Sequence, residues 1–145
     1  MSAAKKPIQI PNAPAPVGPY SQAILKGDTL YISGQIPLNP GTGLLELDNI
    51  EMATTRVLQN IDALLQEAGF TVDDVVMVSI FMKDLGEFSA MNQVYASYFE
   101  GVAPARQTVE VARLPLDVTI EISCIAQKWP KNAAMIWVSW SLITT

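Results

Sequence analysis

Two segments near the end of the chain alternate polar with apolar side chains, which is the pattern of strands that have two different faces. The polar positions are Arg106, Thr108 and Glu110 in the first segment and Thr119, Glu121 and Ser123 in the second. An arginine guanidinium is a planar fork that binds a carboxylate through two parallel hydrogen bonds. A partly buried carboxyl group, whose pKa is raised, can transfer protons and orient a water molecule. Arg106 and Glu121 are therefore the candidate catalytic residues for a reaction on a small carboxylic acid.

The same alternation also fits an ordinary solvated sheet face. The apolar positions, which would then share the opposite face and point into the core, are Val109, Val111, Ile120 and Ile122. Pro104 precedes Arg106, and Leu114 and Pro115 close the segment that carries it. Such rigid framing favours a positioned guanidinium over a solvated face.

Further residues are candidates to line a binding site. Tyr20, Ser33 and Asn92 offer directional hydrogen bonds, and Gly34 lets a ligand approach the backbone closely. Each also has a structural interpretation, because Tyr20 can pack a strand end, Gly34 can form a bulge and Asn92 can be a solvated helix residue.

The chain contains no histidine. This excludes Ser-His-Asp and Cys-His catalysis, histidine-paired ribonuclease chemistry and most zinc sites. Acid–base chemistry must then come from Asp, Glu, Tyr, Lys or the single cysteine, and no metal site is expected.

The composition limits the compartment and the partners. A net charge of -5, with no basic run longer than Lys5 and Lys6, argues against a nucleic-acid partner. Charged residues make up 16% of the chain, below the usual ~25%, which indicates an oligomer that covers one face. The single Cys124, the lack of a secretory signal and the lack of an apolar run of ~18 residues favour a cytoplasmic protein with no membrane partner.

The elements that must position these residues follow from periodicity. A proline-rich irregular lead-in covers residues 7–19, and a hairpin follows with its turn at 26–28. A helix with Asp48 as its N-cap runs to Gly69, and a second helix covers 87–99. The predicted strands that surround the second helix are a buried central strand at 75–83 and two last strands at 107–113 and 118–126. The order ββαβαββ predicts an α+β fold, a mixed sheet with two helices on one face.

Residues 128–145 differ in kind from the rest, because they carry almost no charge and hold both Trp137 and Trp140. An extra element docked on the body is the favoured interpretation of this apolar tail; a sequence scar and an exposed patch for a partner are the alternatives. We therefore divide the chain into one domain at 1–127 and an atypical C-terminal tail at 128–145.

Three segments resemble the Rid family of reactive-intermediate imine deaminases, also called the YjgF or L-PSP family. They are GPYSQA (18–23), LYISGQIPLNPGTG (30–43) and PARQTVEVARLPLDVTIEISCIA (104–126). The similarity runs from about Pro7 to Gln127 and includes QNIDALLQEAG on the first helix. The pattern P-x-R-x-x-V-x-V-x-x-L-P-x-x-x-x-x-E is long and therefore specific.

The resemblance implies a chorismate-mutase-like homotrimer whose sheets form a central barrel, with the sites between subunits. It implies hydrolysis of 2-imino acids and of enamines such as 2-aminoacrylate and 2-aminocrotonate to 2-keto acids and ammonia, with no cofactor. By motif position, Arg106 binds the substrate carboxylate and Glu121 activates or orients water. The residues that line the pocket by the same argument are Tyr20, Ser33, Gly34 and Asn92.

The sequence departs from the family pattern in two places. Thr108 stands where many members have cysteine, so this site lacks that thiol but keeps a hydroxyl donor and acceptor. Members of the family also tend to end near Gln127, so the resemblance does not explain the tail.

A simple hairpin about Pro115 and Leu116 would pair residues whose numbers sum to roughly 231. Arg106 and Glu121 would then lie about 13 Å apart along the strands, too far to hold one small acid. We therefore expect the two residues of one site to come from different subunits. The same register predicts that Glu110 lies near Glu121 and raises one of the two pKa values.

Two other functions stay open. One is an endoribonuclease or translation inhibitor, an activity also attributed to relatives, against which the negative charge and the lack of histidine argue. The other is a non-catalytic binder of small carboxylic metabolites, or a chaperone, which would use the Arg106 pocket or exposed apolar surface without turnover.

Overall fold

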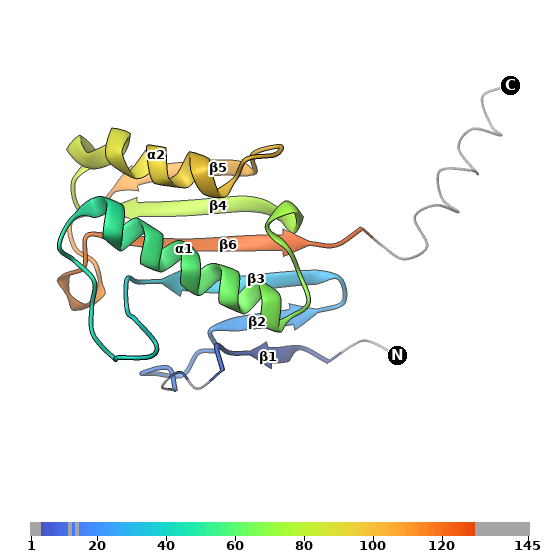
Figure 1. The fold of residues 1–145 in the computed structure, drawn as a ribbon. Helices are drawn as coiled ribbons and strands as arrows, with labels where there is room; N and C mark the ends of the chain where they lie inside the picture. The colour runs from blue at the N-terminus through green and yellow to red at the C-terminus, as the bar shows by residue number, and fades with distance from the viewer. Residues whose placement is uncertain (1–3, 12, 14, 130–145) are drawn as a thin grey trace, which may run out of the picture.

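The computed structural model describes residues 4–11, 13 and 15–129. In chain order the elements are β1 (Lys6–Ile8), β2 (Ala23–Lys26), β3 (Thr29–Gln35), α1 (Ile50–Glu67), β4 (Val75–Met82), α2 (Phe88–Tyr98), β5 (Ala105–Glu110) and β6 (Ile120–Gln127). The strands form one mixed sheet in the order β1-β2-β3-β6-β4-β5. Both helices lie on the same face of this sheet (Figure 1). The predicted α+β fold is confirmed.

The first helix begins one residue later than predicted. Asn49, and not Asp48, is the N-cap of α1, because the Asn49 side chain accepts a hydrogen bond from the Met52 N–H at 2.8 Å. The helix ends before Gly69, whose φ of 77° lies in the left-handed region that glycine adopts easily. Its buried stripe, which covers the sheet, is Ile50, Ala53, Val57, Leu58, Ile61, Leu64 and Leu65.

The core lies between the helices and the sheet. Val78, Ile80 and Met82 of β4 and their neighbours on β6 are fully or almost fully buried on the helix side. The predicted central strand is confirmed, since β4 lies between β6 and β5. Its burial alternates along the strand, so it is buried on the helix face only.

The last two strands are not a hairpin, contrary to the prediction. β5 pairs in parallel with β4, β6 pairs antiparallel with β4, and β4 lies between them. A short 3-10 turn at Pro115–Asp117, with Leu116 and Asp117 at a φ of 55°, leads across to β6. The chain makes a parallel crossover through α2, which places β5 at one edge of the sheet.

This topology separates the two candidate catalytic residues. Val78 of β4 lies between Arg106 of β5 and Cys124 of β6 in the strand register. In the same way, Phe81 of β4 lies between Val109 of β5 and Glu121 of β6. Neighbours across strands share a face. Arg106 therefore lies on the helix face, and Glu121 lies on the opposite face, which neither helix of the described residues covers (Figure 1). The predicted shared polar face was wrong, because a register shift of one residue exchanges the two faces of a strand.

The lead-in contains a strand that the sequence analysis did not predict. β1 pairs with β2 from Lys6 opposite Leu25 to Ile8 opposite Ala23. Its Pro7 lies on the outermost strand, where the lack of an N–H is tolerated. Among the residues described, no helix is long and apolar enough to cross a membrane. Most of the tail predicted at 128–145 lies outside the described residues, which end at Trp129.

Candidate active site

The guanidinium of Arg106 lies against one stripe of α2. Its Nη1 donates a hydrogen bond to Asn92 Oδ1 at 2.6 Å. Its central carbon lies 4.7 Å from the ring centroid of Tyr95 and 5.5 Å from that of Phe88. Positions 88, 92 and 95 follow one another at helical spacing, so a single face of α2 holds the arginine of β5.

Arg106 has unused hydrogen-bonding capacity. Within the described part of the chain it forms no ion pair; the two ion pairs found there join Arg56 to Glu46 and Arg113 to Asp117. A guanidinium has five N–H donors, and the contact with Asn92 uses one. A half-buried arginine held by an amide and two rings, without a carboxylate partner of its own, is suited to bind a carboxylate from outside the chain.

Two hydroxyl groups are buried close to this arginine without a hydrogen-bond partner among the described residues: Thr108 Oγ1 and the Tyr95 hydroxyl. Thr108 is two residues from Arg106 on the same face of β5. Burial raises the pKa of Tyr95, and the positive charge of Arg106 acts against that rise. A buried hydroxyl without a partner is costly in a folded protein, so the Thr108 hydroxyl, on the strand that carries Arg106, marks a place where a ligand can supply the missing hydrogen bond.

Glu121 lies on the other face in a different environment. Its side chain is half-buried, and burial raises its pKa above the ordinary value. The predicted neighbour Glu110 does not contribute, because it lies on the helix face and its carboxylate accepts a hydrogen bond from the Leu85 N–H at 3.0 Å. The predicted proximity of Glu110 and Glu121 is therefore wrong, and desolvation by burial is the cause that raises the pKa of Glu121.

Gly34 makes room for the Glu121 carboxyl group. A Cβ at position 34 would lie 2.5 Å from Glu121 Oε1 and 2.7 Å from its carboxyl carbon. The pairing of β3 with β6 shifts register between Ile32 and Gln35, so this glycine lies in an irregular part of the strand. Next to it, Ser33 Oγ donates to the Ser21 carbonyl at 2.6 Å.

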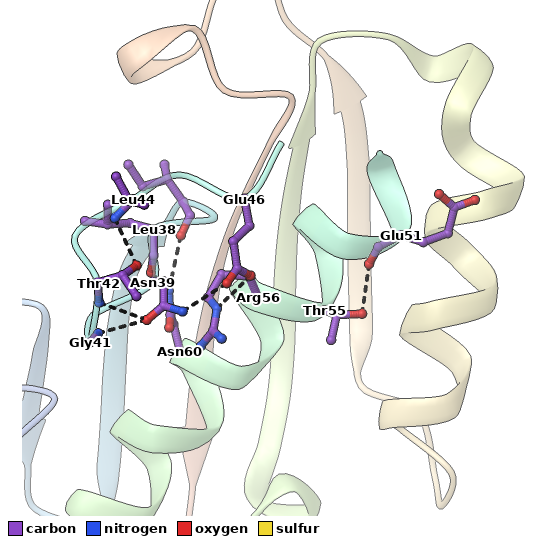
Figure 2. A network of polar contacts seen from close by, with 11 residues as sticks. Leu38, Asn39, Gly41, Thr42, Leu44, Glu46, Glu51, Thr55, Arg56 and Asn60 are labelled. Atoms are coloured by element: carbon purple, nitrogen blue, oxygen red, sulfur yellow. Dashed lines mark hydrogen bonds and ion pairs between the residues drawn. The ribbon is translucent and has the colours of Figure 1, made fainter. Parts of the chain in front are cut away.

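The loop after β3 is tied to α1 by a polar network (Figure 2). The Asn39 amide donates to Glu46 Oε1 at 3.0 Å, and Arg56 Nε donates to Glu46 Oε2 at 3.0 Å. The buried amide of Asn60 donates to the Leu38 carbonyl at 2.9 Å. The hydrogen bond from Arg56, followed by that from Asn39, lowers the pKa of Glu46. The network fixes the chain just beyond Gly34.

Tyr20 is 56% exposed and is not one of the residues described above as contacts of the Arg106 side chain. It lines an open cavity of about 360 Å³ together with Pro7, Pro16 and Ser21. The hydrogen bond between Ser33 and the Ser21 carbonyl connects this segment to Gly34 and Glu121.

The candidate residues therefore fall into two groups on one chain. Arg106, Asn92 and Thr108 form the arginine half-site on α2 and β5. The glutamate half-site consists of Tyr20 from the segment before β2, Ser33 and Gly34 from β3, and Glu121 from β6. Phe88 and Tyr95 were not predicted from the sequence as contacts of Arg106, although their spacing around Asn92 was a usable signal. In the described ranges no three His, Cys, Asp or Glu side chains gather to hold a metal ion.

Comparison with known proteins gives consistent matches over most of the chain. The profile of the endoribonuclease L-PSP family matches residues 10–128. A RutC family protein of Saccharolobus solfataricus is 54% identical over 116 residues, which are 80% of this chain and 92% of that protein. The chloroplastic reactive intermediate deaminase A of Arabidopsis thaliana is 41% identical over 125 residues, which are 86% of this chain and 67% of that protein. The crystal structure of E. coli TdcF with bound serine has a TM-score of 0.81 at 36% identity and covers 86% of this chain and 99% of that one.

Proposed function

The chain belongs to the endoribonuclease L-PSP family, and from this premise we propose that it hydrolyses 2-imino acids and their enamine tautomers to 2-keto acids and ammonia. The observation that carries the proposal is the half-buried Arg106, held by Asn92 and two rings and lacking a carboxylate partner among the described residues. A relative named reactive intermediate deaminase and a relative solved with serine, a small amino acid, support the reaction and the substrate size.

Each half-site has a task in this reaction. Arg106 binds the substrate carboxylate through its free N–H donors, and the Thr108 hydroxyl supplies a further hydrogen bond. The Glu121 carboxyl, with its raised pKa, protonates C3 of an enamine to give the imine. Its carboxylate then accepts a proton from water as the water oxygen attacks C2. Glu121 returns this proton to the nitrogen, the new hydroxyl group gives up its proton to solvent as the C2=O bond forms, and the C2–N bond breaks. Nitrogen leaves as ammonia, and a 2-keto acid remains. No cofactor takes part.

The two half-sites meet between subunits of a homotrimer. In one chain they lie on opposite faces of a sheet, so no acid of three or four carbons contacts both. The face that carries Glu121 also carries Met77, Phe81 and Ile125, with Val109 44% exposed. Burying this apolar face against two further copies, as the walls of a central barrel, removes it from water. The domain that assembles ends at Gln127, and the tail at 128–145 lies beyond it.

Turnover of 2-aminoacrylate tests the proposed function. Excess serine dehydratase generates the enamine from serine, so that its hydrolysis to pyruvate limits the rate. We expect the protein to accelerate pyruvate formation in proportion to its concentration. Two results would contradict the proposal: no acceleration although the protein binds pyruvate, which would indicate a binder, or cleavage of RNA by the same preparation without deamination.

Replacing Gly34 by alanine tests the position of the Glu121 carboxyl. The new methyl group would overlap Glu121 Oε1, so the carboxyl must move, and displacing a catalytic group by about 1 Å can lower turnover roughly 100-fold. The backbone at Gly34 does not lie in the left-handed region, so the unfolding temperature should change little. Gly101→Ala is the matched control, since a Cβ there meets nothing closer than 3.5 Å. Full activity of Gly34→Ala would show that Glu121 need not occupy this position.

A further inference from the structure

We propose that the rings of Phe88 and Tyr95 are positioning residues that set the plane of the Arg106 guanidinium and so make the site selective for a carboxylate. The substrate of this site is taken from the proposed function, whereas the two tests below measure binding and an NMR signal and do not require turnover. Neither ring belongs to the residues that the family motifs assign to the site.

The need for positioning follows from the place of Arg106 in the fold. β5 is an edge strand with a neighbour on one side only, and an arginine side chain has four rotatable bonds. The hydrogen bond from Nη1 to Asn92 fixes one nitrogen but leaves the guanidinium free to turn about that contact. A bidentate grip requires the whole plane to be fixed, because both N–H bonds must point at the carboxylate together.

The two rings supply that restraint. The guanidinium carbon lies 4.7 Å from the Tyr95 centroid and 5.5 Å from the Phe88 centroid, both within the range of attraction between a cation and a ring face. The two rings lie on the same stripe of α2 as Asn92, Phe88 one turn before it and Tyr95 one turn after it. Tyr95 is itself held, since it is 6% exposed and its ring lies 4.6 Å from that of Phe99.

The hydroxyl of Tyr95 is not what holds the arginine. It is buried and has no partner within the described residues, whereas the ring makes the contact with the guanidinium. The proposal therefore separates Tyr95→Phe, which keeps the ring, from Tyr95→Leu, which removes it.

Tyr98→Leu provides a matched control. Tyr98 lies on the same helix, is half-buried and makes its hydrogen bond to Asp62 of α1 at 3.2 Å. The same substitution there removes a ring from the interface between the helices without removing a ring from Arg106. A general loosening of α2 should affect both leucine variants alike.

The first experiment compares the affinities of the wild type and the variants for pyruvate and for its neutral amide, pyruvamide, by titration followed by NMR. Loss of one ring contact should weaken pyruvate binding about 10-fold in Tyr95→Leu and by a similar factor in Phe88→Leu. Pyruvamide binding should change less than two-fold, and Tyr95→Phe and Tyr98→Leu should retain the affinity for pyruvate. Equal losses in Tyr95→Phe and Tyr95→Leu, or in Tyr98→Leu and Tyr95→Leu, would overturn the proposal.

The second experiment needs neither ligand nor turnover. Protons of a guanidinium stacked on aromatic faces are shifted upfield by the ring currents, and the Arg106 signal is assigned by its disappearance in Arg106→Ala. We expect an upfield-shifted Arg106 signal in the wild type and in Tyr95→Phe, and its return to an ordinary position in Tyr95→Leu. An unshifted wild-type signal would overturn the positioning role. An unreactive protein that shows the shift would contradict only the proposed function.

Discussion

Arg106→Ala should lower kcat/KM for 2-aminoacrylate by about 30-fold or more, which corresponds to about 2 kcal/mol. The substrate carboxylate would enter the site without its cationic partner and would have to give up hydration that nothing replaces. Arg106→Lys should recover only part of the loss, because an ammonium keeps the charge but offers neither the planar fork nor the same stacking on Tyr95. Pyruvate formation from enzymatically generated enamine measures the effect.

The unfolding temperature serves as the control for this prediction. The Arg106 side chain makes a single hydrogen bond within the described residues, and the residue lies on an edge strand. Arg106→Ala should therefore unfold within a few degrees of the wild type. A variant that folds normally and keeps more than a third of wild-type kcat/KM would show that the carboxylate is held elsewhere.

A mixture of Arg106→Ala and Glu121→Gln chains should regain activity that neither variant has alone. Arg106 and Glu121 lie on opposite faces of the sheet of one chain, so the proposed reaction requires an arginine from one subunit and a glutamate from the next. In a cyclic trimer reassembled at random from equal amounts, about a quarter of the sites combine both native residues. The measurement is pyruvate formation before and after the two proteins are dissociated together and reassembled.

The outcome distinguishes two architectures sharply. If one chain supplied both residues, every chain in the mixture would lack one of them, and reassembly would restore nothing. Reassembly of each variant with itself controls for damage during dissociation. Co-expression of equal amounts of the wild type and a chain carrying both substitutions provides a second check. About a quarter of the sites keep both native residues if each site is shared between two subunits, and about half keep them if one chain supplies both.

Glu121→Gln should be no less stable than the wild type at neutral pH, which makes it a fair partner for that mixture. Burial raises the pKa of Glu121 in the folded chain. The neutral carboxyl group therefore contributes fully to folding stability below the pKa that Glu121 has in the unfolded chain. This contribution is lost as the pH rises through the higher pKa that Glu121 has in the folded chain. Glutamine never ionises, so it avoids that loss above the folded pKa.

The long first helix was predictable because its signals are local. The apolar spacing from Ala53 to Leu65 gives the buried stripe, and Gly69 gives the end. The start was one residue off, since Asp48 and Asn49 are both good caps and only the three-dimensional path decides which side chain reaches the Met52 N–H.

The pairing of the last strands was not predictable from the same kind of signal. Consecutive strands with a short connection usually pair, and nothing in residues 105–127 reveals that β4 lies between them. The wrong pairing also assigned the residues of β5 to the wrong faces of the sheet. Val109, expected in the core, is exposed, and Thr108, expected on the polar face, is half-buried. The expectation that one site draws on two subunits stands as a prediction, now for a different reason, since the obstacle is the sheet itself and not distance along a hairpin.

Phe88 and Tyr95 illustrate why the candidate site was only partly predictable. Their spacing is that of one stripe of α2, and Tyr95 on this stripe is buried. What the stripe meets there depends on the long-range contact between α2 and β5, which periodicity does not contain. An aromatic residue of a helix core and an aromatic support for an arginine therefore look the same in the sequence.

The crossover from β4 through α2 to β5 has a consequence for the order in which the molecule is completed. Among the described residues, the hydrogen-bond partner of the guanidinium and the two rings near it come from a continuous stretch of 19 positions, from Phe88 to Arg106. Glu121 meets Gly34 only after β6 has paired with a strand formed some ninety residues earlier. Contacts that are near in sequence close fast, and distant ones close slowly. We therefore expect a folding chain to form the arginine half-site before the glutamate half-site, and the proposed trimer would bring the two together last.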